Sequence, residues 1–407
     1  MKQLVKARAI ITATDDPPIE HGCMVVEDGR ILWIGAVEAL PPDMAGGARG
    51  ADAAETVETV DLSDQWVMPG LIDSHTHLSI VPAEGDQLEQ LRLPAGRAIV
   101  RSIPNMRKNL RSGVTVTRIM GQEHHIDVDL KRAVEEGLVE GPRLVISGIG
   151  LVASNGHGVA LTVTDGVDEV RRRIRRNLAL GTDFVKVFVT GGMSSERSSV
   201  DVCGYTAGEV AAAVEEAARS DTYVAAHAHG GRGVDLCIEQ GVRTIEHGAL
   251  LTGRQLEAMI ERDMWVVGTF AILFHPEGIE KTDFGVPAIK EKVLRAREVV
   301  ARNFERVLSS GVSLAVGTDS MHGLIGYELE CLVRFGATPL RAVQAATREA
   351  ARACRVEDDL GTLEAGKTAD FISLSADPLE DIRNIRTVRR VFKEGVQVVY
   401  NPAKSHE

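Results

Sequence analysis

The chain has 407 residues, of which 44% are hydrophobic and 26% are charged. These proportions are typical of a folded globular protein and exclude a disordered chain or a fibrous repeat. The length exceeds the ~250–300 residues that one hydrophobic core usually serves, so we expect a large domain with an accessory unit. No apolar run approaches the ~18 residues of a membrane helix, and the first residues do not resemble a secretory signal. We therefore expect no membrane partner and a cytoplasmic location.

The charge balance argues against a nucleic-acid partner. Lys and Arg total 46 against 58 Asp and Glu, a formal net charge of -12, whereas phosphate neutralisation needs a basic surface. The basic run at 171–176 has helical character, and we interpret it as a solvated helix face. The five cysteines are scattered and lack a C-x-x-C pair, which predicts buried apolar side chains rather than disulfides or a zinc knuckle.

The two ends of the chain share one pattern. Short alternating runs with Gly, Pro and Asp turns, such as Glu27-Asp28-Gly29, occupy the first sixty residues. The same pattern returns after Asp370, where Glu394-Gly395 separates two short strands. These patterns predict that residues 1–68 and 361–407 pair into one small β-sandwich beside the main domain.

Residues 69–360 alternate short β-rich runs with helical stretches. Eight such runs predict strands: Leu71–Asp73, Val114–Arg118, Leu144–Ser147, Phe184–Val189, Tyr223–Ala226, Arg243–Glu246, Trp265–Gly268 and Ser313–Val316. Eight strands alternating with helices are typical of an α/β fold of the (β/α)8 TIM barrel type, whose active sites lie at the carboxyl ends of the strands. An open doubly wound sheet is disfavoured because no glycine-rich first turn is found.

Histidines and one aspartate fall at several of these strand ends: His75 and His77, His227 and His229, His247, and Asp319. Residues two apart on an extended segment point to the same side, so the first pair can present two imidazoles to one ion. A pair held only by hydrogen bonds at the barrel mouth is the alternative, and the repetition at successive strands favours the metal site.

Lys186 lies inside the predicted fourth strand between Val185 and Val187. Burial of an ammonium favours the neutral amine, which reacts with carbon dioxide to form a carbamate. A carbamate carries a negative charge like a carboxylate and can bridge two divalent ions. The alternative is a lysine that reaches solvent or an ion pair.

These motifs resemble the amidohydrolase superfamily, and the resemblance spans nearly the whole chain. The stretches VMPGLIDSHTH and GTLEAGKTADFISL are similar to the two junctions between barrel and β unit in that superfamily. Within it, NGHG, HAHG followed by TIEHG, and GTDS followed by HG are similar to the branch of binuclear-metal dipeptidases and carboxypeptidases, including prolidases that cleave Xaa-Pro.

The resemblance implies two divalent ions, zinc being the expected metal. One ion takes His75, His77, a carbamate on Lys186 and Asp319, and the second takes the same carbamate, His227 and His247. A hydroxide bridging the ions attacks the carbonyl carbon. Asp319 moves the proton to the departing amine.

For the substrate we expect a dipeptide or an N-acyl amino acid whose amide bond is hydrolysed. We expect His157, in the loop after the third strand, to donate a hydrogen bond to the oxyanion that develops during the reaction. We expect further substrate contacts from His229, Arg232 and His322. Arg232 is proposed for the substrate carboxylate, with an exposed helix residue as the alternative. The resemblance also implies a homo-oligomer.

Other activities stay open at this point. A metal-activated hydroxide also attacks cyclic amides, as in an imidazolonepropionase-like enzyme, and organophosphates, carbamate esters or lactones. A non-catalytic scaffold is disfavoured because all six metal positions are filled.

Overall fold

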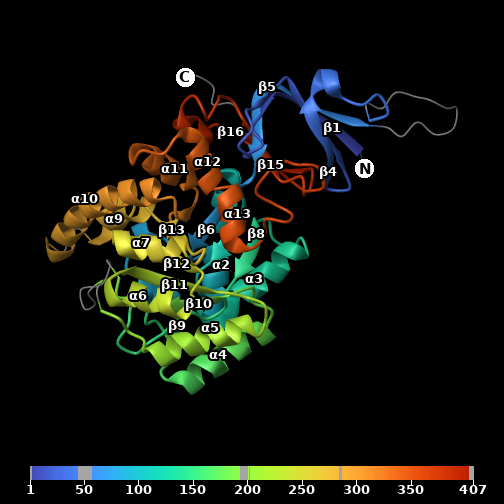
Figure 1. Ribbon diagram of the computed structural model, residues 1–407. Coiled ribbons are helices and arrows are strands. Elements are labelled where there is room, and N and C mark those ends of the chain that lie inside the picture. Colours follow the sequence, from blue (N-terminus) through green and yellow to red (C-terminus); the bar gives the residue numbers. More distant parts are fainter. Residues whose placement is uncertain (1, 45–56, 193–199, 201, 284–286, 403–407) are drawn as a thin grey trace.

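The computed structural model describes residues 2–44, 57–192, 200, 202–283 and 287–402. A barrel of parallel strands surrounded by helices forms most of the molecule, and a separate sheet that contains strands from both ends of the chain lies at one side (Figure 1). This arrangement confirms the expected α/β fold with a TIM barrel and an accessory β unit. None of the helices in the described ranges combines the length and the apolar character of a membrane-spanning segment.

All eight predicted barrel strands are present. They are β6 (Leu71–Thr76), β7 (Val114–Ile119), β8 (Arg143–Ile146), β10 (Val185–Phe188), β11 (Val224–Gly230), β12 (Thr244–Leu250), β13 (Trp265–Gly268) and β14 (Ser313–Val316). Every hydrogen-bonded pair among them is parallel, and the pairs form two sheets, one of β6, β7 and β8 and one that runs from β10 to β14. A short strand that the sequence did not predict, β9 (Leu151–Val152), pairs with β10.

Helices follow the strands and cover the outside of the barrel. They are α1 (Gln87–Leu91), α2 (Ala95–Arg111), α3 (Ile126–Glu135), α4 (Val167–Ala179), α5 (Ala207–Ala218), α6 (Gly231–Gln240), α7 (Gly253–Ile260), α8 (Ala271–Phe274), α9 (Ile279–Asp283), α10 (Pro287–Ser310), α11 (Ile325–Arg334), α12 (Pro339–Ala345) and α13 (Arg348–Cys354). Local sequence explains their ends: Thr206 and Glu209 form a reciprocal capping box at the start of α5.

The basic run on α4 is only partly a solvated face. Arg171 and Arg175 both reach across to Glu216 on α5, with N–O distances of 2.7 and 2.6 Å. The expectation that this run faces only solvent is therefore corrected for two of its members. Four of the five cysteines are buried, and none forms a disulfide.

The accessory sheet combines residues 2–69 with residues 371–400. Its strands are β1 (Lys2–Ile10), β2 (Ile19–Glu20), β3 (Gly22–Glu27), β4 (Arg30–Ala36), β5 (Glu58–Pro69), β15 (Phe371–Leu374), β16 (Val388–Lys393) and β17 (Val396–Tyr400). β5 lies between β1 and β15, so it joins the two ends of the chain. Apolar side chains from both ends, including Val5, Met24 and Phe371, form one core. The domain boundaries after residues 68 and 360 stay predictions.

The barrel closes where its first and last strands meet. The Asp319 N–H donates to the His75 carbonyl at 2.8 Å. The buried Asp73 carboxylate accepts from the Thr318 backbone N–H at 2.9 Å and from its hydroxyl at 2.6 Å. Gly317 permits this approach, because a Cβ there would lie 2.3 Å from the His75 nitrogen. Two residues of the predicted site are therefore held together by the closure itself.

Asp73→Ala removes the carboxylate that joins β6 to the segment after β14. We expect the free energy of unfolding to fall by about 3 kcal/mol, because hydrogen bonds to a buried charged group contribute ~1.5–3 kcal/mol and their loss leaves donors unsatisfied. Urea unfolding followed by circular dichroism measures the change. Glu257→Ala on the exposed face of α7 is the control, and an equal effect of both variants would contradict the closure role.

Candidate metal centre and active site

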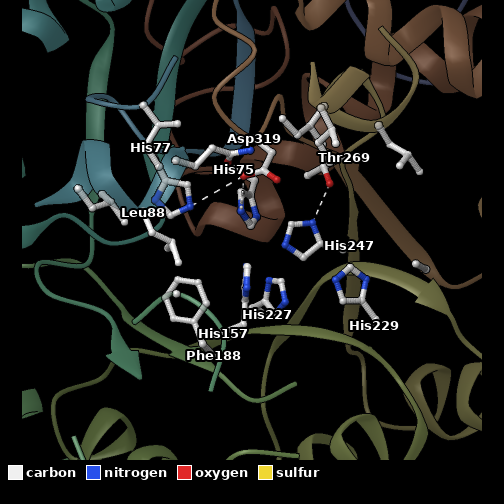
Figure 2. Close-up of a pocket in the computed structure, with 18 of the residues that line it drawn as sticks. His75, His77, Leu88, His157, Phe188, His227, His229, His247, Thr269 and Asp319 are labelled. Atoms are coloured by element: carbon white, nitrogen blue, oxygen red, sulfur yellow. Dashed lines mark hydrogen bonds and ion pairs between the residues drawn. The ribbon is translucent and has the colours of Figure 1, made fainter. Parts of the chain in front are cut away.

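A cavity of about 560 Å³ lies at the carboxyl ends of the barrel strands. Figure 2 shows six histidines, His75, His77, His157, His227, His229 and His247, together with Asp319 around it. They come from strands or loops that lie far apart along the chain. The barrel therefore gathers into one cavity most of the polar residues that the sequence singled out.

His75, His77 and Asp319 lie on one side of this cavity. The Nε2 atoms of His75 and His77 lie 3.5 and 3.9 Å from Asp319 Oδ1. The Nδ1–H of His75 donates to Glu246 at 2.7 Å, and the Nδ1–H of His77 donates to the Gly121 carbonyl at 3.1 Å. Each ring therefore keeps an Nε2 lone pair toward the aspartate, which is how metal-binding histidines are usually held.

Three further histidines lie opposite this group. The His227 ring centroid is 4.5 Å from that of His247 and 4.7 Å from that of His157. His247 Nδ1 forms a 2.7 Å hydrogen bond with the Thr269 hydroxyl, and His227 Nε2–H donates to the Gly191 carbonyl at 3.3 Å. His75 and His247 connect the two sides, with ring centroids 4.7 Å apart.

Lys186 is buried in β10, with 1% of its surface exposed. Its Nζ has no hydrogen-bond partner among the described residues, and it lies 4.6 Å from the centroid of the Phe188 ring. Burial lowers the pKa of Lys186 to about 8. An unpaired buried amine is costly unless it is neutral or modified, so this residue fits the chemistry that the sequence predicted for it.

The electrostatics of the cavity favour a bound cation. Burial lowers the pKa of His77 to about 3 and depresses the pKa values of His75, His227 and His247 well below the usual histidine range. These imidazoles are therefore neutral lone-pair donors at pH 7. Burial raises the pKa of Asp319 to about 7, which a nearby cation would reverse.

Distances among the donors fit a metal ion. One ligand atom each of His75, His247 and Asp319 lies within 4.8 Å of the others. Neutral imidazoles and a carboxylate are the ligands that zinc prefers. The residues present therefore fit the divalent metal that the motifs predicted.

Backbone conformation at two of these residues is unusual. His247 has a φ of 71° and Asp319 a φ of 46°, both in the left-handed region. Such conformations cost of order 1–3 kcal/mol each and persist only where the surrounding structure imposes them. For Asp319 the imposing contacts are those that close the barrel.

Sequence reasoning missed two residues behind His75. Glu246 on β12 accepts from His75, and Arg118 on β7 binds the same carboxylate with distances of 2.9 and 3.0 Å. Arg118 and Glu246 each have 0% of their surface exposed. Arg118 also donates from Nε to the Ser74 carbonyl at 2.6 Å. A charged residue within each of these buried strands was the one local signal, and it marks each residue singly without indicating that they pair.

His157 lies in the cavity wall, on the loop between β9 and α4. Gly192 allows its approach, because a Cβ there would lie 2.4 Å from the imidazole. Arg92 also lines the cavity and donates to the Ala160 carbonyl at 3.0 Å, so it ties the end of α1 to the loop that carries His157.

The structure does not bring Arg232 and His322 to the cavity. Arg232 is the second residue of α6, with an exposed side chain that pairs with Glu239 at 2.7 Å, since the chain enters a helix at once instead of folding back. The His322 Nε2–H donates to the Ile80 carbonyl at 3.0 Å, and His322 is not among the lining residues. Both expectations are corrected. His229, by contrast, lines the cavity, with its ring 5.1 Å from that of His247.

Comparison with known proteins agrees with this geometry. The amidohydrolase family model matches residues 66–398. The ochratoxinase of Aspergillus niger is 27% identical over 94% of this chain and 83% of its own, and its crystal structure superimposes with a TM-score of 0.85. A crystal structure of a Xaa-Pro dipeptidase with bound methionine is 28% identical, with a TM-score of 0.85 over 98% of this chain and 99% of that one. The imidazolonepropionase of Maricaulis maris is 28% identical over 90% of this chain and 91% of its own.

Arg118→Met leaves the Glu246 carboxylate buried without its guanidinium. We expect the free energy of unfolding to fall by about 3–5 kcal/mol, the usual effect of breaking a buried ion pair. Zinc affinity should fall about 10–100-fold, because Glu246 without Arg118 no longer fixes the orientation of the His75 ring. Urea unfolding and competition with a chelator measure the two effects. Arg254→Met, which removes a surface pair with Asp235, is the control. Unchanged zinc affinity in Arg118→Met would contradict the orienting role.

Proposed function

The chain belongs to the amidohydrolase family, and we propose that it hydrolyses the amide bond of a dipeptide or an N-acyl amino acid with two divalent ions, most simply zinc. The observation that carries the proposal is the buried Lys186 amine, which has no hydrogen-bond partner among the described residues and lies close enough to His75, His227 and Asp319 to act on their charge. Similarity to a Xaa-Pro dipeptidase and to an ochratoxinase supports it.

The proposed ligands divide between the two ions. His75, His77 and Asp319 would hold one ion, His227 and His247 would hold the other, and Lys186, as a carbamate, would contribute to both. The carbamate forms when the neutral Nζ attacks carbon dioxide and releases one proton. When bound, such ions acidify a water molecule and polarise a carbonyl oxygen.

Two residues of this chain act on the reacting atoms. Asp319 accepts the proton of the attacking water and delivers it to the nitrogen of the departing amine, so the amide and water become a carboxylate and an amine. General acid–base transfer of this kind contributes roughly 10²–10⁴-fold to the rate. His157 donates a hydrogen bond to the oxygen that becomes negative in the transition state.

The lining of the cavity supports a substrate with two unlike parts. Leu273, Ile279 and Phe304 make one region apolar. Gln87, Glu89 and Arg92 make another region polar, and Arg92 pairs there with Glu89 at 2.6 Å. Arg92 is the one arginine or lysine among the described lining residues. An apolar acyl or amino-acid side chain suits the first region, and a polar end of the substrate suits the second.

Hydrolysis of a cyclic amide is the second candidate, favoured by the similarity to the Maricaulis maris imidazolonepropionase. The polar and apolar regions of a cavity of about 560 Å³ are less well filled by one small ring than by a linear substrate.

Lys186→Ala should lose bound metal and activity together, because the shared ligand disappears. Elemental analysis should find close to two zinc ions per chain in the unmodified protein and less than one in the variant. Partial recovery of activity with acetate or propionate would support the carbamate. Lys281→Ala, an exposed lysine paired with Glu277, is the control. Full metal occupancy in Lys186→Ala would refute the shared role.

The substrate class is tested with the zinc-loaded protein and matched libraries of dipeptides, N-acyl amino acids, cyclic amides, lactones and phosphotriesters. We expect kcat/KM for the best linear amide to exceed that for every cyclic amide or ester. Preference for a ring, lactone or phosphotriester would overturn the linear-amide proposal.

Asp319→Asn should lower kcat by about 10²–10⁴-fold on the best linear amide, as expected for loss of a proton-transfer group.

A further inference from the structure

A second cluster of polar side chains lies outside the catalytic cavity, where the start of α3 meets α4. A surface cleft of about 400 Å³ is lined there by Glu123, His124, His125, Leu161, Arg173 and Arg176, among others. A smaller pocket of about 90 Å³ shares Arg173 and Arg176 with it. None of these residues takes part in the hydrolytic mechanism proposed above.

The arginines of α4 differ in their partners. Arg171 and Arg175 pair with Glu216, and Arg172 pairs with Glu169 at 3.4 Å. Arg173 and Arg176 have no ion pair or hydrogen bond with any residue that the structure describes. They are three positions apart on the helix, so their guanidinium groups are neighbours on one face.

The cleft places two guanidinium groups together, and the two nearby acids, Glu123 and Glu169, form no ion pair with either of them among the described residues. Arg173 is half-buried, and burial together with the charge of Arg176 lowers its pKa, against the opposing charges of Glu123 and Glu169. Glu123 is the acidic residue of the larger cleft, and its carboxylate already accepts from the Thr162 hydroxyl at 2.9 Å and from the Thr162 backbone N–H at 3.1 Å. Two neighbouring guanidinium groups are therefore available to an incoming anion.

Backbone geometry holds the opposite wall of the cleft in place. His124 and His125 follow one another with φ values of 60° and 54°, both in the left-handed region. The ring of His125 is fixed by a 3.0 Å hydrogen bond between its Nε2 and Asn177 Oδ1. Non-glycine residues rarely adopt this conformation in succession, and such strain is concentrated at binding and catalytic sites.

We propose that this cleft binds an oxyanion of the phosphate class through the guanidinium groups of Arg173 and Arg176. Planar guanidinium groups match the oxygens of phosphate in paired hydrogen bonds. The site is distinct from the metal centre and does not rest on the hydrolytic activity. It lies against Leu161 and Thr162, which belong to the same loop as His157, so binding there also stabilises the loop that lines the catalytic cavity.

The test compares the metal-loaded protein with the double variant Arg173→Gln, Arg176→Gln. Isothermal titration with inorganic phosphate is expected to give a site whose affinity falls about tenfold or more in the variant, a loss of roughly 1.4 kcal/mol. Phosphate that enters the catalytic cavity is counted separately, by its inhibition constant against hydrolysis, which should be the same in both proteins. A parallel titration with a sugar phosphate distinguishes free phosphate from a phosphate monoester as the preferred ligand.

The matched control is Arg254→Gln, Arg295→Gln, which removes the same charge from two surface ion pairs. It should leave phosphate binding unchanged. Hydrogen exchange at the Leu161 and Thr162 amides should slow with phosphate in the unmodified protein and in the control, and not in the test variant. Equal phosphate affinity in all three proteins overturns the proposal. A changed oligomeric state in the test variant without a change in phosphate binding also overturns it, and assigns the two arginines to contact between copies of the chain.

Discussion

The catalytic side of the barrel depends on one buried carboxylate. Glu246 lies between the guanidinium of Arg118 and the imidazole of His75, out of contact with water. A charge in that position is stable only with a full set of partners, so the three strands that carry these residues cannot move independently. The orientation of His75 is therefore determined inside the barrel, at a distance from the loops that meet solvent.

The proposed metal ligands and the apolar wall of the cavity come from different parts of the fold. The proposed metal ligands lie on strands or immediately after them, where closure of the barrel and buried hydrogen bonds restrict them. The apolar wall of the cavity comes instead from helices outside the barrel, including α9 and α10, through Ile279, Val300 and Phe304. Changes in those helices alter the shape of the cavity without touching the groups that hold the metal. Such separation allows many chemistries to develop on one barrel scaffold.

Much of the fold and of the candidate site could be predicted from the sequence, because strands in a barrel and the polar residues at their ends have local signatures. These signatures predicted all eight strand runs and the union of the two chain ends in one β unit. They also predicted that His75, His227 and Asp319 gather at one site. Partners that meet only across the barrel have no such signature. Arg118 and Glu246 are 128 positions apart, and nothing near either residue indicates the other. Arg232 was misplaced because the glycines beside it predicted a returning loop, whereas the chain continues directly into α6. The homo-oligomer and the cytoplasmic location stay predictions.

The position of β5 has a consequence for how the protein is made. This strand pairs with β1 on one side and with β15 on the other, and residues 66–69 of β5 meet residues 371–374 of β15. During synthesis the partner on the second side is therefore missing until residues 371–374 have been made. Throughout that time one edge of β5 is open to pairing with other chains, which is a recognised route to aggregation. The barrel thus separates two halves of a sheet that can be completed only after residues 371–374 have been made.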